Sequence, residues 1–331
     1  MDSLEHKTLH VSRGFTYSYY ISEPRGSKPT LLLQHGFPDD AHLWSAVVPR
    51  LSSYRLVVPD LLGYSGTSKP TDPESYLYEK LSGDLVEILD AEGIDKVVSV
   101  GHDFGSMVAQ RFYNYHPDRV TALILLNVGY AVLPETETEL DVQALNNLAE
   151  QLFGYPAISY QEFFMADDAP AILEAHLDRL YQAIHGDPVG WTKELWGARG
   201  ALRKWLVDEQ REVDVLSYAQ DPAMRQRFIE RFQQGGFAAP LCYYKAQNLG
   251  LQTKAARRLA EDRFVVRVPV LYVICRQDPA CLPEWFAPAK QKGCLPDLEE
   301  VSIDSRHWSP MEKPKEVSGH ILSFLERKLE S

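Results

Sequence analysis

The chain has 331 residues, about twice the usual size of a single domain, so we expect one large domain or a core with an inserted second unit. Hydrophobic residues make up 45% and charged residues 24%, as in ordinary globular proteins, which excludes a disordered or fibrous chain. The 34 Lys and Arg against 46 Asp and Glu leave a net charge of −12, which repels phosphate backbones and anionic lipid surfaces. Nucleic acid is therefore not a predicted partner.

The cysteines and the apolar runs indicate the cellular compartment of the protein and whether it spans a membrane. Its 4 cysteines include no C-x-x-C pair and are too few for a disulfide framework in a chain of this length, which fits a reducing compartment. The N-terminus lacks an apolar core after a basic end, so no secretory signal is predicted. The longest uncharged apolar run, 120–134, is shorter than the roughly 20 residues of a membrane span. We predict a cytoplasmic protein with no membrane span.

Strand and helix patterns alternate along the first part of the chain. Residues 8–12 and 15–22 alternate in polarity around Arg13-Gly14, which predicts an N-terminal hairpin. Apolar residues recur at helical spacing over 77–89, and Gly93 follows where that helix would end. Short aliphatic runs typical of strands covered on both faces lie at 30–34, 56–58, 97–100 and 122–126.

The same pattern resumes near the C-terminus, with strands predicted at 270–274 and 298–303 and an amphipathic helix at 315–329. This alternation predicts an α/β fold with a mostly parallel, doubly wound sheet. Residues 132–263 differ, because they carry helix-like segments rich in aromatic side chains and no buried-strand signal. We interpret them as a helical cap domain inserted into a core domain made of 1–131 and 264–331.

The most informative stretch is Gly101-His102-Asp103-Phe104-Gly105, which directly follows a predicted strand and precedes a helix beginning near Ser106. Small residues on both sides of an acid allow a sharp turn that lifts the middle side chain, as in a nucleophile elbow. The middle residue is Asp103 and not serine, so a carboxylate is the candidate nucleophile. An ordinary acidic turn is the alternative interpretation.

A second loop, Gln34-His35-Gly36-Phe37-Pro38-Asp39, follows the predicted strand at 30–34. The backbone N–H groups of Phe37 and Phe104 could point at the same place and provide two donors for a developing oxyanion. The Phe37-Pro38 bond is a candidate cis peptide. No H-E-x-x-H motif or Cys/His spacing accompanies His35 or His102, so no metal is predicted.

An acid and a histidine end the last two predicted strands. Asp278 follows the strand at 270–274, and His307 follows the strand at 298–303. Nucleophile, acid and histidine in this order along the chain are typical of α/β-hydrolase triads. Each residue alone is a weak signal, but all three lie where predicted strands end.

At this point the sequence resembles the soluble epoxide hydrolases of the α/β-hydrolase fold, over nearly the whole chain. Besides the motifs around Asp103 and Phe37, the segments in family order are Gly63-Tyr64-Ser65-Gly66, His116-Pro117-Asp118-Arg119-Val120, His307-Trp308 and Glu312-Lys313-Pro314. Leu241-Cys242-Tyr243-Tyr244-Lys245 looks like the family's Leu-Asn-Trp-Tyr-Arg segment. Phe104 stands where tryptophan is commoner, and Cys242 and Lys245 replace Asn and Arg.

The resemblance implies a mechanism without a cofactor, in which water is the only other reactant. Asp103 would attack an epoxide, Tyr160 and Tyr244 would polarise the departing oxygen, and His307, oriented by Asp278, would activate water against the resulting ester. Tyr155 and Tyr243 are the nearest competitors for the tyrosine roles. The substrate pocket is predicted to include His35, Pro38, Trp44, Tyr243 and Trp308.

The expected substrate is a small apolar epoxide, the product a vicinal diol, and the protein a monomer or weak homodimer. A haloalkane or haloacid dehalogenase would use the same Asp, His and acid, but fluoroacetate dehalogenases carry arginine where Phe104 and Met107 stand. Many haloalkane dehalogenases have asparagine at the position of Phe37. A hydrolase-fold receptor without turnover is the non-enzyme alternative, although such a protein is expected to lose a member of the triad.

Overall fold

The computed structural model describes residues 1–132, 140–208 and 211–330. The chain divides into two compact units. The first comprises Met1–Pro70, Glu74–Glu137 and Gln252–Ser331, and the second comprises Thr71–Pro73 and Thr138–Leu251. The described helices include none with the length and hydropathy that crossing a bilayer requires.

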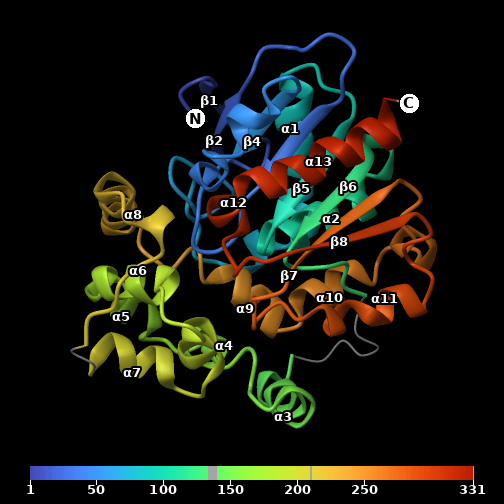
Figure 1. Ribbon diagram of the computed structural model, residues 1–331. Coiled ribbons are helices and arrows are strands. Elements are labelled where there is room, and N and C mark those ends of the chain that lie inside the picture. Colours follow the sequence, from blue (N-terminus) through green and yellow to red (C-terminus); the bar gives the residue numbers. More distant parts are fainter. Residues whose placement is uncertain (133–139, 209–210, 331) are drawn as a thin grey trace. The chain divides into compact units, whose positions relative to one another are not determined.

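An 8-stranded sheet forms the centre of the first unit (Figure 1). The strands are β1 (Glu5–His10), β2 (Thr16–Ile21), β3 (Thr30–Gln34), β4 (Arg55–Pro59), β5 (Val97–His102), β6 (Val120–Leu126), β7 (Val270–Cys275) and β8 (Leu298–Ile303). Their order across the sheet is β1-β2-β4-β3-β5-β6-β7-β8. β2 runs antiparallel to β1 and to β4, and the other neighbours are parallel. The predicted hairpin and the mostly parallel sheet are confirmed.

Helices cover both faces of this sheet, which explains why β5 is buried along its whole length. The described helices of the first unit are α1 (Tyr78–Ala91), α2 (Phe104–Tyr115), α11 (Ala287–Gln291), α12 (Ser309–Glu312) and α13 (Pro314–Leu329), with α10 (Leu251–Ala256) at the unit boundary. α2 packs on β5, β6 and α1, while α13 crosses the opposite face, in front of the strands in Figure 1. α1 and α13 match the helices predicted over 77–89 and 315–329.

The second unit is helical in its described residues, apart from an isolated bridge between Gly186 and Val215. Its helices are α3 (Val142–Phe153), α4 (Tyr160–Phe164), α5 (Ala169–Ala175), α6 (Leu177–His185), α7 (Ala201–Val207), α8 (Pro222–Gly235) and α9 (Cys242–Asn248). Most are too short to be stable alone, so packing of their apolar faces must hold them. A cluster of aromatic rings from α4, α9 and Trp196 provides part of that packing.

The start of α2 lies so close to the end of β3 that only glycine fits there. A Cβ on Gly105 would lie 2.2 Å from the backbone oxygen of Gln34 and 2.5 Å from that of His35. Both obstacles are main-chain atoms, so a methyl group can be accommodated only if α2 moves away from β3.

We therefore predict that Gly105→Ala lowers the free energy of unfolding by about 3 kcal/mol, since overpacking against backbone cannot be relieved by side-chain rotation. Gly83→Ala is the matched control, because a Cβ on Gly83 in α1 meets nothing within 4 Å. That change should raise stability by about 0.5–1 kcal/mol. Urea unfolding of the two variants measures both values, and equal midpoints would contradict the steric argument.

Candidate active site

Asp103 occupies the turn between β5 and α2, at the point where the order of the parallel strands reverses. β3 pairs with β4 on one side and with β5 on the other, and chain connections leave these strands in opposite directions. Ligands of open α/β sheets bind beyond the carboxyl ends of the strands at such a switch point. Asp103 has φ 56° and ψ −124°, a conformation that non-glycine residues rarely adopt. This strained turn is the predicted nucleophile elbow.

Two backbone N–H groups point at the carboxylate of Asp103. The N–H of Phe37, in the loop after β3, donates to Oδ1 at 2.9 Å, and the N–H of Phe104 also hydrogen-bonds the carboxyl group. Gly36 makes the approach possible, because a Cβ there would lie 2.3 Å from Asp103 Oδ1. The Phe37–Pro38 peptide is cis. Both predicted oxyanion donors therefore meet at one carboxyl group.

His307 lies between the other two predicted members of the triad. Its Nδ1 is 2.7 Å from Asp278 Oδ2, and its Nε2 is 3.6 Å from Asp103 Oδ2. Because the ionised Asp278 only accepts hydrogen bonds, Nδ1 carries a proton and donates a hydrogen bond to Asp278. Nε2 is then the nitrogen that faces Asp103 and can exchange a proton there. The structure thus brings together Asp103, His307 and Asp278 from the ends of β5, β8 and β7.

The fully buried carboxylate of Asp278 is held by four donors. Besides His307, Asn127 Nδ2 donates to Oδ2 at 2.7 Å, and the backbone N–H groups of Ala280 and Cys281 donate to Oδ1 at 3.0 and 3.2 Å. Asn127 is fixed in turn, because its Oδ1 accepts from Ser309 Oγ at 3.0 Å. Sequence reasoning missed Asn127, although it directly follows β6, which is the same placement that singled out Asp278 and His307.

The three groups shift one another's pKa values. Burial acts to raise the pKa of Asp278, but the charge of His307 and the hydrogen bonds from His307 and Asn127 outweigh it and hold that pKa well below its usual value. Burial acts to lower the pKa of His307, and the charges of Asp278 and Asp103 overcome it and raise the pKa to about 9. Burial raises the pKa of Asp103, against the opposing effects of His307 and the N–H groups of Phe104 and Phe37.

The neighbouring histidines support the backbone. His35 is fully buried, and its Nε2 accepts from the N–H of Leu61 while Nδ1 contacts the carbonyl of Gly36, both at 2.9 Å. His102 Nε2 donates to the carbonyl oxygen of His307 at 2.7 Å. Burial lowers the pKa of His102 to about 3, so this ring is neutral, and its hydrogen bond supports the backbone of His307.

Two predicted pocket tryptophans lie in the first unit. The ring of Trp308 packs edge-on against His307 with centroids 4.7 Å apart, and its Nε1 donates to Asp39 Oδ2 at 2.9 Å. Trp44 is fully buried at the end of the short helix Ala41–Trp44, which follows the loop after β3. Trp308 is thus adjacent to the triad. The pocket roles assigned to Trp308, Trp44, His35, Pro38 and Tyr243 all stay predictions.

The tyrosines expected to take part belong to the second unit. Tyr160 begins α4 and Tyr244 lies in α9, and their rings meet edge to face with centroids 5.9 Å apart. Tyr243, which precedes Tyr244 in the sequence, is buried, whereas the ring of Tyr155 packs against the ammonium group of Lys193. The structure therefore pairs Tyr160 with Tyr244, the two residues that the family resemblance singled out.

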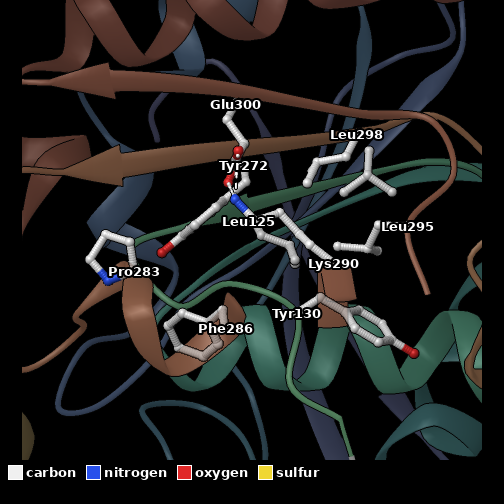
Figure 2. Close-up of a pocket in the computed structure, with 10 residues that line it drawn as sticks. Leu125, Tyr130, Tyr272, Pro283, Phe286, Lys290, Leu295, Leu298 and Glu300 are labelled. Carbon is white, nitrogen blue, oxygen red and sulfur yellow. Dashed lines mark hydrogen bonds and ion pairs between the residues drawn. The ribbon is translucent and has the colours of Figure 1, made fainter. Parts of the chain in front are cut away.

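A small cavity beside β7 and β8 is distinct from this constellation (Figure 2). Its volume is about 10 Å³, roughly that of one water-sized sphere, so no organic substrate fits. Mostly apolar side chains line it, including Leu125, Phe286 and Leu298, and its charged groups, Lys290 and Glu300, are bound to each other at 3.0 Å. Nothing in its lining provides a nucleophile next to a base.

Known proteins resemble this chain along its whole length. A family model for the alpha/beta hydrolase fold matches residues 29–314. Epoxide hydrolase 3 of Siraitia grosvenorii is 30% identical over 348 residues, which cover 99% of this chain and 100% of that protein.

Many solved structures are similar to this chain in three dimensions. A mutant epoxide hydrolase of Vigna radiata superposes with a TM-score of 0.77 at 25% identity, covering 99% of this chain and 100% of that one. Epoxide hydrolase I of potato (Solanum tuberosum) gives a TM-score of 0.76 at 25% identity, covering 98% and 99%.

Proposed function

The chain belongs to the epoxide hydrolases of the α/β-hydrolase fold family, and we propose that it hydrolyses a small apolar epoxide to a vicinal diol through a covalent ester of Asp103. The observation that carries this proposal is the convergence on Asp103 of two backbone donors and of His307, which itself binds Asp278. A carboxylate in this position suits a neutral, strained electrophile that lacks a carbonyl group.

In the first step, Asp103 attacks one carbon of the epoxide, and the bond between that carbon and the ring oxygen breaks. Unlike serine, a carboxylate with an ordinary pKa of about 3.9 needs no base to become a nucleophile at neutral pH. Burial opposes ionisation of Asp103, and the N–H groups of Phe37 and Phe104 together with His307 favour it. The same groups that anchor the carboxylate therefore oppose its protonation before attack.

The departing oxygen needs a proton donor, and we assign this role to Tyr160 and Tyr244. Phenols with ordinary pKa values near 10 remain protonated at neutral pH and can donate hydrogen bonds to a developing alkoxide. The edge-to-face contact between the two rings, with centroids 5.9 Å apart, supports their acting as a pair. In this proposal the second unit is the cap domain that provides both phenols.

In the second step, His307 removes a proton from water, which attacks the ester carbonyl of Asp103. The N–H groups of Phe37 and Phe104 then bind the oxyanion, each typically contributing about 3 kcal/mol to barrier lowering. When the oxyanion collapses, the bond between the carbonyl carbon and the substrate oxygen breaks, that oxygen takes the proton from His307, and the diol leaves with the Asp103 carboxylate restored. Formation of the ester removes the negative charge of Asp103, which is one of the charges that raise the pKa of His307. Alkylation should therefore release His307 toward its neutral form, in which it can act as a base.

The reaction so described uses only water, and we propose that no cofactor takes part. A cytoplasmic location is also proposed, and the four free cysteines, three buried and one partly buried, support it. A monomer or weak homodimer remains our expectation for the assembly.

A single turnover in ¹⁸O-labelled water tests the covalent ester directly. Because water attacks the ester carbonyl, solvent oxygen should enter the Asp103 carboxylate, and the diol of the first turnover should carry the unlabelled aspartate oxygen. Mass spectrometry of the peptide that contains Asp103 and of the diol measures both. Label found only in the diol would mean that water attacks the epoxide itself and would overturn the proposal.

His307→Gln should separate the two steps. The variant keeps a polar side chain but has no base, so we expect one equivalent of epoxide to be opened and steady turnover to fall by about 10²–10⁴-fold. The peptide containing Asp103 should gain the mass of the substrate. Unchanged turnover would show that another group activates the water.

Tyr160→Phe and Tyr244→Phe should each slow ester formation, measured by rapid mixing with excess enzyme. The remaining phenol can partly compensate, so we expect about a tenfold loss for each single variant and about 10²–10⁴-fold for the double variant. Tyr155→Phe is the matched control, since that ring packs against Lys193. Parent-like rates in both single variants would show that other residues donate the proton.

A further inference from the structure

Cys281 is a thiol that the proposed reaction does not use, and it lies directly beside the triad. Its Sγ is 3.8 Å from His307 Nδ1. Together with a carboxylate oxygen of Asp278, these three atoms lie within 4.8 Å of one another. One sulfur, one nitrogen and one oxygen donor therefore converge in a single place.

The turn after β7 brings the thiol there. The backbone N–H groups of Ala280 and Cys281 both donate to Asp278 Oδ1, so the chain turns back around the carboxylate of Asp278. This turn fixes the position of Cys281 relative to Asp278, and Asp278 holds His307 through Oδ2. The three donors are thus arranged by backbone and side-chain bonds that exist independently of any ion.

The spacing suits a tetrahedral ion. With Zn–S near 2.3 Å and Zn–N near 2.0 Å, a sulfur and a nitrogen ligand lie roughly 3.5 Å apart, close to the distance observed between Cys281 and His307. The 2.7 Å contact between His307 Nδ1 and Asp278 Oδ2 must lengthen by less than about 1 Å once an ion replaces the proton between them. Side-chain rotations can supply such a movement.

The surrounding charges also favour a cation. The carboxylates that act most strongly on the thiol are Asp278 and Asp103, both negative when ionised. A mixed set of thiolate, imidazole and carboxylate selects a borderline or soft ion, whereas Mg²⁺ and Ca²⁺ require several oxygen ligands.

We propose that Asp278, Cys281 and His307 form a binding site for one thiophilic divalent cation, Zn²⁺ or Cd²⁺, and that its occupation inhibits the enzyme. On binding, the Cys281 thiol and His307 Nδ1 each release a proton to solvent, the ion takes the two freed lone pairs, and the neutral imidazole keeps its remaining proton on Nε2. The nitrogen that faces Asp103 then cannot accept a proton from water.

The mode of inhibition follows, and this part rests on the proposed function. Opening of the epoxide by Asp103 does not require a basic nitrogen, but hydrolysis of the ester does. An enzyme with the ion bound should therefore open one equivalent of epoxide and then accumulate the ester.

Binding is tested first, without substrate, on the full-length chain. Titration with Cd²⁺ should produce the ultraviolet charge-transfer absorption of a cadmium–thiolate bond, saturating at one equivalent. Cys281→Ser keeps the backbone N–H and the shape of the side chain but loses the thiolate, so this absorption should disappear. Cys294→Ala removes a buried cysteine elsewhere and should leave it intact. Persistence of the signal in Cys281→Ser, or its absence from the parent, overturns the site.

Inhibition is tested second, as the ratio of turnover with and without Zn²⁺ for each variant. The Zn²⁺ concentration that halves the rate should be more than about 100-fold higher for Cys281→Ser than for the parent, because losing a residue outside the ligand set typically costs about 10- to 100-fold in metal affinity. Adding a chelator should restore the turnover of the parent. Mg²⁺ should have no effect. Ester on Asp103 should accumulate only with Zn²⁺, whereas loss of turnover without ester would refute the proposed mode of inhibition. If the enzyme turns over no epoxide, the Cd²⁺ titration still decides the site.

Discussion

The hydrogen bond from the Phe37 N–H to the Asp103 carboxylate joins two loops that are 66 residues apart in the chain. It exists because β3 and β5 pair in parallel register from Thr30 with Val97 to Gln34 with Gly101, so both loops leave the sheet at the same level. Gly36 and Gly105 then allow the close approach, because a Cβ on Gly36 would collide with the Asp103 side chain and a Cβ on Gly105 with the backbone of Gln34 and His35. A slip of one residue in this register would turn every side chain of β5 to the other face and separate nucleophile from donor.

Asp103, His307 and Asp278 interact electrostatically, so the pKa of each one depends on the charge of one or both of the others. Two carboxylates flank one imidazole, and each carboxylate makes the protonated imidazole more stable. Asp278 accepts four hydrogen bonds and stays ionised, while Asp103 has fewer partners and is the carboxylate that can form a bond to carbon. In the proposed mechanism, these different environments assign Asp278 to orient His307 and Asp103 to attack the substrate.

Much of the first unit could be predicted from sequence because buried parallel strands leave an unmistakable aliphatic pattern, and polar residues just beyond them stand out. The start of α2 was misplaced by two residues, since the helix begins at Phe104 and not near Ser106. The carbonyl of Asp103 already accepts the N–H of Ser106, so the elbow doubles as the first turn of the helix. Asn127 and Cys281 could not be assigned to the site from sequence, because neither belongs to a motif. Asn127 reaches Asp278 from the end of β6, and Cys281 reaches it from the turn after β7. The pairing of Tyr160 with Tyr244 rested on family resemblance, because short helices rich in aromatic residues carry no signal for which rings meet.

Because the two donors at Asp103 belong to the main chain, the side chains at positions 37 and 104 take no part in the hydrogen bonds to its carboxylate. Any amino acid that retains a backbone N–H can occupy either position and preserve the donor, and proline is the single residue type that abolishes it. Exchange of Phe37 or Phe104 can therefore change the side chains that lie beside Asp103 while both backbone donors to its carboxylate stay in place.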